Sequence, residues 1–434
     1  MSESSATSWT DSFLHFAGFD WAKNEHDVVI VARDGRIVEQ FQFEDSAAGW
    51  SQFRDRIASY LPMAVAVETN CGPAVERLLQ SGVTVYPVQP KAAARYRERK
   101  VPTGVKNNFI DAWSLADALR LDGHTWRPLQ PDDPLIQELR LLCRDEVALI
   151  EQRTALINQL QQAIYEYYPA AREAFDDWTL AAAWEFVIEF PSSEQLIRAG
   201  KKRWEKFLKS RGLARPQTYS KRLEIFAASQ RFRGTAPVTA AKSRLAVALA
   251  KQLLTLEEQL RLYRSRIRQL FEQHPDHELF GSLPGLGDKL APRMLAECAG
   301  DPQRFPSTQE LQCVAGSAPV SFESGQMHQV RIRRACNKFL RATVHLWANL
   351  SRPYCVWAET YYQRKREQKM SHACALRCLA QRWLKILWKM LQTKTSYDEA
   401  LHTRNQTEHG SWVVALLPNR SSKNSVHNLD PVCS

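Results

Sequence analysis

Apolar residues form short runs over the first 90 positions of the chain, each bounded by charged or turn-forming residues. Such runs predict strands at 13–20, 63–68 and 83–88, and a hairpin at 27–38 that turns at 33–36. Helical spacing or helix-start residues predict helices at 47–60, 72–82 and 111–120. The first third of the chain is therefore predicted to be an α/β unit built on one sheet.

From residue 135 onward, the apolar positions follow helical spacing over much longer stretches. One helix is predicted from Leu135 to Tyr165 and a second from about Ala240 to Gln273. In the second helix the apolar positions step by four and three residues, the seam of a coiled coil, at Leu249, Leu253, Leu256, Leu260, Tyr263, Ile267 and Leu270. The two helices could pair within one chain or between two chains.

Three acidic residues stand at the ends of the predicted elements. Asp20 and Glu68 each end an apolar strand, and Asp111 opens a helix. Any one of them alone would be read as a turn or cap residue, but together they would gather negative charge that is costly unless a cation neutralises it. Mg²⁺, or Mn²⁺ in its place, prefers such oxygen ligands. The pattern indicates an RNase H-like, RuvC-type sheet and metal-dependent chemistry on nucleic acid.

The charge of the chain changes the picture of its middle part. The sequence has 434 residues, enough for two or three domains, and a net charge of +11, which favours a polyanionic partner. Twelve Lys or Arg lie between Arg198 and Arg233, and Lys201, Lys202 and Arg203 are the candidates for phosphate contact. Trp and Phe residues interleave with these cations over about 170–235. The aromatic residues could stack on unpaired bases or form the core of a small helical subdomain. We expect most of them to form the core and the cations to contact phosphate.

The cysteines and the lengths of the apolar stretches indicate the cellular compartment in which the protein is expected. Nine cysteines are scattered without a Cys-x-x-Cys pair, which predicts a reduced, cytoplasmic protein. We find no apolar stretch of membrane-spanning length and no signal peptide, so no membrane is expected as a partner.

The last third combines a glycine-containing turn with a basic segment. The stretch 283–289, Leu-Pro-Gly-Leu-Gly-Asp-Lys, resembles a helix-hairpin-helix, whose backbone N–H groups could hold a DNA phosphate. Further on, Arg331, Arg333, Arg334 and Lys338 are either clamps on DNA phosphates or a solvated edge. Helices are predicted at about 339–350 and 370–391. We expect four parts: an acidic domain at 1–127, a helical domain at 128–275, a mostly helical domain at 276–400, and a flexible tail at 401–434.

The order and spacing of these features, over about residues 14–400, resemble the insertion-sequence transposases with a DEDD motif. That family includes the Piv-type DNA invertases and the bridge-RNA-guided serine recombinases. The matching segments are Gly18-Phe-Asp20, Val67-Glu68, the stretch Lys106-Asn-Asn-Phe-Ile-Asp-Ala112, and the stretch from Gly316-Ser-Ala-Pro319 to Phe322-Glu-Ser-Gly325. Ser324 falls where such proteins carry a nucleophilic serine.

The resemblance implies a bacterial, nucleoid-associated DNA transposase or recombinase. In it, Ser324 would attack a DNA phosphate to form a 5′-phosphoserine link, with Mg²⁺ held by the acids. It also implies a dimer or tetramer and a noncoding guide RNA as partner.

One position departs from the family pattern. Asn108 stands where the third acid is expected, which removes one negative charge from the metal ligands. Asp117 is six residues beyond Asp111 and well round the helix, so it is a poor substitute. Two alternatives stay open: a RuvC-like nuclease or resolvase that uses water, and a disabled relative that only binds nucleic acid.

Overall fold

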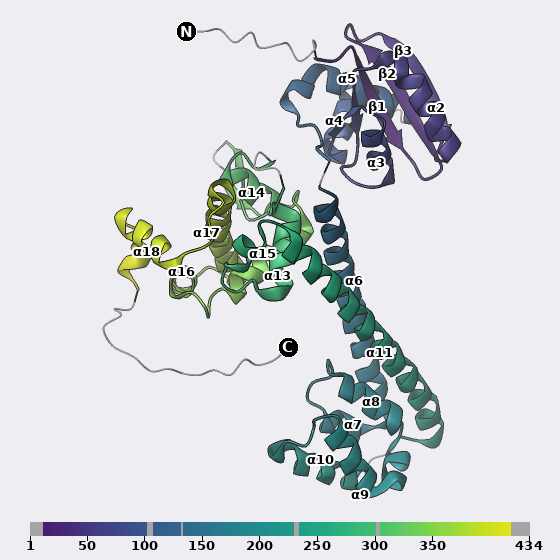
Figure 1. Cartoon of the computed structure of the whole chain (residues 1–434), viewed down its shortest axis with the longest axis vertical. Helices are drawn as coiled ribbons and strands as arrows, with labels where there is room; N and C mark the ends of the chain where they lie inside the picture. Colours follow the sequence, from purple (N-terminus) through teal and green to yellow (C-terminus); the bar gives the residue numbers. More distant parts are fainter. Residues whose placement is uncertain are drawn as a thin grey trace. The chain divides into compact units, whose positions relative to one another are not determined.

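The computed structural model describes residues 12–101, 107–131, 133–229, 234–300, 304–325 and 327–417, and it divides into two compact units, Met1–Asp132 and Asp133–Ser434. The first unit contains a five-stranded mixed sheet in the order β3-β2-β1-β4-β5 (Figure 1). The strands are β1 (His15–Trp21), β2 (Glu25–Ala32), β3 (Ile37–Glu44), β4 (Met63–Val67) and β5 (Thr84–Pro87). The antiparallel β1–β2–β3 meander continues into the parallel strands β4 and β5. The predicted α/β sheet is thus confirmed.

Helices cover both faces of this sheet. Helices α2 (Ala47–Ile57) and α3 (Pro73–Gln80) pack on one face, and α4 (Pro90–Lys100) and α5 (Asn108–Asp122) pack on the other; two short 3-10 turns, η1 (Ala58–Tyr60) and η2 (Gly123–Thr125), complete the unit. The strands alternate between the two cores, as the period of two requires: Ala17 and Phe19 of β1 face α2 and α3, whereas Phe16 faces α5.

Gly18 of β1 lets α5 approach the sheet closely. A Cβ atom at this position would lie 1.8 Å from the carbonyl oxygen of Ala112 in α5. Because this carbonyl belongs to the backbone of α5 and Gly18 belongs to a central strand, neither can move aside without displacing a whole element. The glycine before Asp20 therefore sets how near the start of α5 lies to β1.

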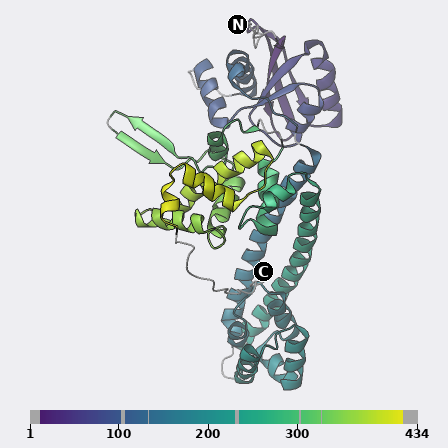
Figure 2. The ribbon, with the colours of Figure 1, turned by 60° about the vertical axis from the view of Figure 1, so that its left-hand side comes forward.

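The second unit is built on two long helices, α6 (Pro134–Tyr167) and α11 (Ala236–Gln273), which lie side by side (Figures 1 and 2). They run antiparallel, because Leu139 near the start of α6 shares a core with Ile267 near the end of α11, while Ile164 shares another core with Leu249. Both predicted long helices are confirmed, and they pair within the chain.

A buried ionic cluster joins these helices to the next part of the unit. Glu146 of α6 is only 3% exposed and accepts hydrogen bonds from Arg264 of α11 and from Arg293 of α13 (Gly287–Cys298). Removing either arginine would leave a buried charge short of a partner, which is strongly destabilising.

Four helices form a small subdomain between α6 and α11: α7 (Pro169–Ala174), α8 (Ala181–Glu189), α9 (Ser193–Ser210) and α10 (Pro216–Ala228). Its aromatic side chains make the core, and the indole N–H groups of Trp184 and Trp204 donate to backbone carbonyls inside it. The expectation that most of the aromatic residues form a core is confirmed, because five of them are buried and cannot stack on bases: Trp178, Trp184, Trp204, Phe207 and Phe226. Phe232 lies outside the described residues.

The C-terminal part of the second unit is mostly helical around a buried tryptophan cluster that includes Trp347, Trp357 and Trp383. It contains α12 (His277–Gly281), α13, α14 (Thr308–Val314), α15 (Lys338–Leu350), α16 (Val356–Glu367), α17 (His372–Thr393), α18 (Glu399–Glu408) and α19 (Trp412–Ala415), with one hairpin, β6 (Val320–Ser324) and β7 (Met327–Arg331). The predicted helices at 339–350 and 370–391 are confirmed. The predicted tail begins with α18 and α19, and its remainder from 418 lies outside the described residues.

The glycine-containing turn at 283–289 joins α12 to α13 and packs into this core. A Cβ on Gly285 would lie 2.6 Å from the backbone nitrogen of Ser351, and the indole of Trp347 donates to the carbonyl oxygen of Pro284. Asp288 adds a negative charge to the first turn of α13. Gly285 thus has a packing role, and phosphate binding by this turn stays a prediction.

Two further features concern the environment of the chain. Among the described residues, no helix combines the length and the apolar character needed to span a bilayer. The eight cysteines in the described ranges are free thiols.

Candidate active site

Strand register collects three carboxylates at one end of the N-terminal sheet. Asp20 of β1 lies directly opposite Asp27 of β2, and Phe19 pairs with Val67 in the parallel neighbour, so Glu68 follows beside Asp20. By alternation, Asp20, Asp27 and Glu68 fall on the face that α4 and α5 cover. The predicted convergence of Asp20 and Glu68 at one sheet end agrees with this register.

Helix α5 brings two more polar side chains to the same face. Asn107 caps the helix by accepting a hydrogen bond from the backbone N–H of Ile110, which fixes the first turn. In that turn Asp111 is 8% exposed, and the Nδ2 of Asn108 donates to Oδ2 of Asp27 at 2.9 Å. Asn108 is thereby linked to the β1–β2 acid pair. Lys106, which belongs to the same motif, lies outside the described residues.

An arginine of α4 already neutralises part of this charge. Nη1 of Arg97 donates to Oδ1 of Asp111 at 2.7 Å. That hydrogen bond raises the pKa of Arg97 above its usual value, and the negative charges of Asp111 and Glu68 act in the same direction. The guanidinium thus stands close to two of the predicted metal ligands.

The donor set fits Mg²⁺ in its chemistry. Carboxylate oxygens with one amide oxygen are hard ligands of the kind that this ion takes. In the described ranges, however, no three His, Cys, Asp or Glu side chains are grouped closely enough to hold a metal ion. The positive charge of Arg97 lies beside Asp111 and Glu68 and offsets part of their negative charge.

Asp117 has a different role from the other acids of α5. Its carboxylate is bound by Lys100 of α4 and by Arg120 one turn further on. Burial raises the pKa of Asp117, but the hydrogen bonds and charges of Lys100 and Arg120 outweigh burial and hold it below its usual value. Arg120 also donates to the carbonyl oxygen of Arg33 at the hairpin turn, the opposite end of β2 from Asp27. Asp117 is therefore a structural ion-pair residue.

Ser324 lies in the second unit, at the tip of the β6–β7 hairpin, which stands out from the surrounding helices (Figure 2). It pairs with Met327 on the other strand, and the next residue, Gly325, has a φ of +56°, the left-handed conformation that a tight hairpin turn requires. Every residue from Ser321 to Gly325 is exposed. The hydroxyl of Ser324 is thus presented on an accessible turn.

The two faces of the hairpin differ in chemistry. Phe322, Met327, Gln329 and Arg331 share a face with Ser324, and the guanidinium of Arg331 lies 4.9 Å from the centre of the Phe322 ring. The ion pair between Glu323 and His328 lies on the opposite face. Arg331 therefore places a positive charge on the face of Ser324, whereas Glu323 and His328, the side chains of this hairpin that could act as a general base, lie on the opposite face.

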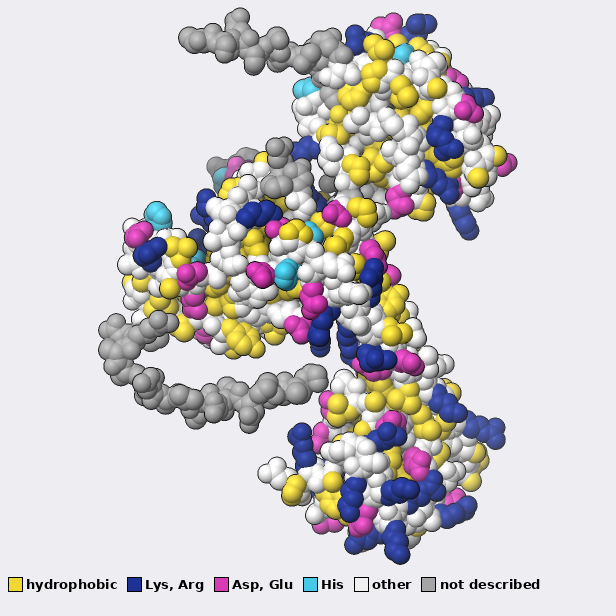
Figure 3. Space-filling view, viewed as in Figure 1, with side chains coloured by type: hydrophobic (Ala, Val, Ile, Leu, Met, Phe, Trp, Pro, Cys, Tyr) yellow, Lys and Arg dark blue, Asp and Glu magenta, His cyan; other side chains and the backbone are white. Residues whose placement is uncertain are grey.

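The other predicted phosphate contacts are distributed unevenly. Arg334 and Lys338 are exposed, but Arg333 is partly buried. In the small subdomain, Lys and Arg gather on the visible surface (Figure 3). There Lys201 and Lys202 are exposed, while Arg203 is held by Glu189 at 2.6 Å.

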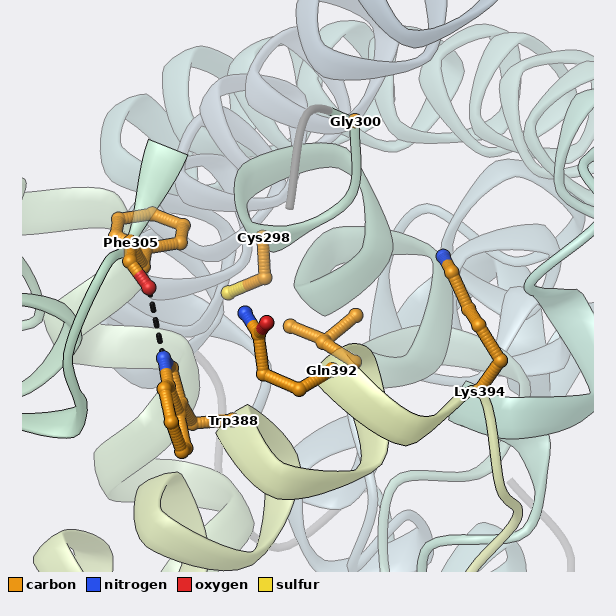
Figure 4. A pocket seen from close by; sticks show the side chains of 7 residues that line it. Cys298, Gly300, Phe305, Trp388, Gln392 and Lys394 are labelled. Carbon is orange, nitrogen blue, oxygen red and sulfur yellow. Dashed lines mark hydrogen bonds between the residues drawn. The ribbon is translucent and has the colours of Figure 1, made fainter. Parts of the chain in front are cut away.

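One small cavity lies in the C-terminal core, between α13 and α17 (Figure 4). Cys298, Phe305 and Trp388 line it, and the indole of Trp388 donates to the carbonyl oxygen of Phe305. Its volume of about 10 Å³ admits no more than a water molecule. Burial raises the pKa of Cys298 to about 12, so this thiol is protonated at neutral pH and is no nucleophile.

Comparison with known proteins bears on both units. Residues 17–169 match a DEDD transposase family named for IS110 and described as "Transposase", and residues 277–363 match the "Transposase IS116/IS110/IS902 family". The chain is 33% identical over 401 residues to the "Mini-circle putative transposase for IS117" of Streptomyces coelicolor, covering 90% of this chain and 97% of that protein. The chain belongs to the IS110/IS116/IS902 family of transposases.

A second relative of this transposase spans nearly the same length. The "Insertion element IS900 uncharacterized 42 kDa protein" of Mycobacterium paratuberculosis is 28% identical over 404 residues, covering 89% of this chain and 98% of that protein. The two family matches contain the acidic sheet end and the Ser324 hairpin, respectively. The resemblance inferred from the motifs is confirmed, and membership in a transposase family implies action on DNA and a divalent metal.

Asp27 is a residue of this sheet end that the sequence pattern did not indicate, because it begins a strand instead of ending one. In a hairpin the start of the second strand lies beside the end of the first, so an acid at that start is the signal that could have revealed it. The strands flanking Gly325 were missed as well.

Proposed function

We propose that this transposase cuts and rejoins DNA by using Ser324 as nucleophile and the acidic sheet end as the metal-binding half of the site. Asp20, Glu68 and Asp111, with Asn108, would hold Mg²⁺, and Asp27 adds a carboxylate beside Asp20 and Asn108. The observation that carries the proposal is the strand register that sets Asp20, Asp27 and Glu68 at one sheet end, in a chain of a transposase family.

The bound metal would supply charge stabilisation for the phosphate oxygens during transfer. The residues of the chain have separate tasks. Arg97 balances the carboxylates, and the short first turn of α5, capped by Asn107, holds Asp111 in place. The glycine at position 18 keeps α5 against β1.

In the proposed reaction, Oγ of Ser324 forms a bond to the phosphorus of one DNA linkage, and the bond from that phosphorus to the 3′ oxygen breaks. The products are a 5′-phosphoserine link and a free 3′-hydroxyl, and the reverse attack by another 3′-hydroxyl rejoins the strands. Arg331, on the same hairpin face as Ser324, is suited to bind the phosphate. The proton of Ser324 must pass to a group outside the hairpin face.

We also propose that the chain acts as a dimer or tetramer and takes its target from a noncoding RNA. The antiparallel α6–α11 pair, which we expect to supercoil as its heptad spacing predicts, would help arrange the copies. Exposed cations such as Lys201 and Lys202 would contact the nucleic-acid backbone.

One observation favours a second candidate, a RuvC-like nuclease that uses water. The acid–histidine pair of the hairpin lies on the face away from Ser324, so the hairpin itself supplies no base to activate the hydroxyl. In that candidate Ser324 is dispensable and the acids suffice.

Covalent trapping separates the two candidates. The full-length chain is incubated with Mg²⁺ and a nicked DNA substrate that prevents rejoining, and adducts are resolved on a denaturing gel. We expect an adduct with the wild type and with Ser321→Ala, which changes the opposite hairpin face, and none with Ser324→Ala. Cleavage by Ser324→Ala without any adduct would favour the water-using nuclease. Sequencing of RNA that copurifies with the chain tests the guide.

A further inference from the structure

Helix α4 carries cations on two sides, and only one side is used by the acidic site. Arg97 and Lys100 turn toward α5 and pair with Asp111 and Asp117. Lys91, Arg95 and Arg99 recur every four residues and so form a stripe on the opposite side of the helix. We name these three residues the α4 stripe.

The α4 stripe is exposed and borders an open hollow. All three side chains are exposed, and none of them forms an ion pair within the described ranges. With Gln89 and Tyr96 they line a hollow of about 500 Å³. Glu98, also exposed, lies at the edge of the stripe and offsets one of its three charges.

An aromatic pair stands at the hollow. The ring of Tyr96 lies 5.8 Å from that of Trp126. Burial raises the pKa of Tyr96, as does its hydrogen bond with Asp122, so the phenol stays neutral and adds no negative charge beside the stripe.

We propose that the α4 stripe is a binding site for the phosphate backbone of the DNA that reaches the acidic sheet end. From Lys91 to Arg99 the helix rises by eight residue steps, about 12 Å, which matches the axial rise of three to four nucleotides of one strand at about 3.4 Å each. An α-helix with its side chains is about 10 to 12 Å across, so DNA on this side passes within one helix diameter of Asp111. The inference rests on the proposed function only in taking DNA as the polymer that is cut.

Matched double variants of the full-length chain test the site. Arg95→Gln/Arg99→Gln removes two charges from the stripe, and Arg36→Gln/Arg54→Gln removes two exposed charges from the hairpin turn and from α2 on the other face of the sheet. Affinity for a labelled DNA duplex is measured by fluorescence anisotropy at several salt concentrations in EDTA, so that no cleavage occurs.

We expect the stripe variant to bind DNA about tenfold more weakly and to lower the slope of log affinity against log salt by about 2. The control should bind like the wild type, and hydrogen exchange of α4 should slow when DNA binds the wild type. Equal binding by the two double variants would overturn the inference, as would a larger loss for an RNA duplex of the same length than for DNA.

The outcome is independent of the serine chemistry. If Ser324→Ala still forms the adduct while the stripe variant loses DNA, the proposed function fails and the α4 site stands. If the adduct maps to Ser324 but the stripe variant binds normally, the α4 site fails alone.

Discussion

At the residue scale, Asp27 bears on the departure of Asn108 from the family pattern. An aspartate at 108 would place its carboxylate against Oδ2 of Asp27, whereas the asparagine donates a hydrogen bond there. The family pattern has a negative charge at position 108. Here a carboxylate lies next to that position instead, on Asp27 of β2. The departure of Asn108 from the motif is therefore compatible with an active site.

Asp27→Asn should weaken Mn²⁺ or Mg²⁺ binding about tenfold, because it removes a carboxylate next to Asp20 and disturbs Asn108. Isothermal titration calorimetry of the full-length chain measures this. Asp34→Asn, at the exposed turn between β2 and β3, is the control and should bind as the wild type does. Equal affinities for both variants would show that Asp27 takes no part.

Replacement of Arg97 should have the opposite effect on metal affinity. Arg97→Gln should raise the affinity for Mn²⁺ about tenfold, because the metal no longer competes with a guanidinium for Asp111. Without metal the same variant should melt at a lower temperature than the wild type, since Asp111 is nearly buried and loses its counter-ion. Arg99→Gln, on the outer side of α4, serves as control. A lower metal affinity in Arg97→Gln would mean that Arg97 supports the site.

The lowered pKa of the buried side chain of His26 should make the stability of the protein depend on pH. His26 is 1% exposed among Phe19, Phe43 and Trp50; burial lowers its pKa, and Asp45 at 3.5 Å offsets this in part. Because the folded-state pKa lies below the ordinary value of 6.5, the unfolded chain binds the proton first as the pH falls. Its stabilising contribution is complete above about pH 6.5 and is lost as the pH falls toward the folded-state pKa.

Thermal or denaturant unfolding of the wild type and of His26→Leu between about pH 8 and pH 5.5 checks this. The wild type should lose up to about 1.4 kcal/mol per pH unit more than the variant below pH 6.5, the effect of one proton. Burial also lowers the pKa values of His274, His345 and His402, but these histidines are present in both proteins, so their effect cancels in the comparison. Parallel pH profiles would contradict the assignment.

At the element scale, the approach of α5 to β1 is the contact on which the acidic site depends. Gly18→Ala should cost about 3 kcal/mol or more, because the new methyl group would overlap the backbone of Ala112. Gly281→Ala, where no atom lies within 4 Å of the added Cβ, is the control. Denaturant unfolding and metal titration measure both; an unchanged unfolding midpoint in Gly18→Ala would show that α5 is free to shift.

The elements that sequence predicted best are those with a clear pattern. The strands β1 and β2 and the helices α6 and α11 have a regular period and clear ends, so their bounds agree with the prediction within a few residues. Strand β3 was predicted to end at residue 38 but continues to Glu44. The β6–β7 hairpin was missed because it buries little: Phe322 is 49% and Val330 is 75% exposed. A two-stranded ribbon outside a larger sheet leaves only its turn as a signal, here the glycine at 325 after Ser324.

The candidate site was predictable only in part. Sequence located Asp20, Glu68 and Asp111 because each ends or opens an element. It could not reveal Arg97, whose pairing with Asp111 arises from the packing of α4 on α5. The aromatic residues of the 170–235 region show the same limit: sequence predicted that most of them form a core, but only tertiary packing shows which ones are buried.

At the scale of the whole molecule, the proposed reaction needs both units, from one copy of the chain or from two, to act on one DNA linkage. The acids belong to the first unit and Ser324 to the second. The first unit contains most of the segment 17–169 that matches one family model, and the second contains all of the segment 277–363 that matches the other. Neither half alone accounts for cutting and rejoining: the acids would support hydrolysis, and the serine would lack charge stabilisation.

The most direct measurement is formation of the Ser324–DNA adduct by Asp20→Asn, with Asp34→Asn as control and DNA binding measured in parallel. If the acidic sheet end acts on the same DNA linkage as Ser324, Asp20→Asn binds DNA yet forms the adduct at least about a hundredfold more slowly than the wild type, whereas Ser324→Ala forms none. An adduct that appears at the wild-type rate in Asp20→Asn would contradict the account, because the acidic sheet end would then play no part in the serine reaction.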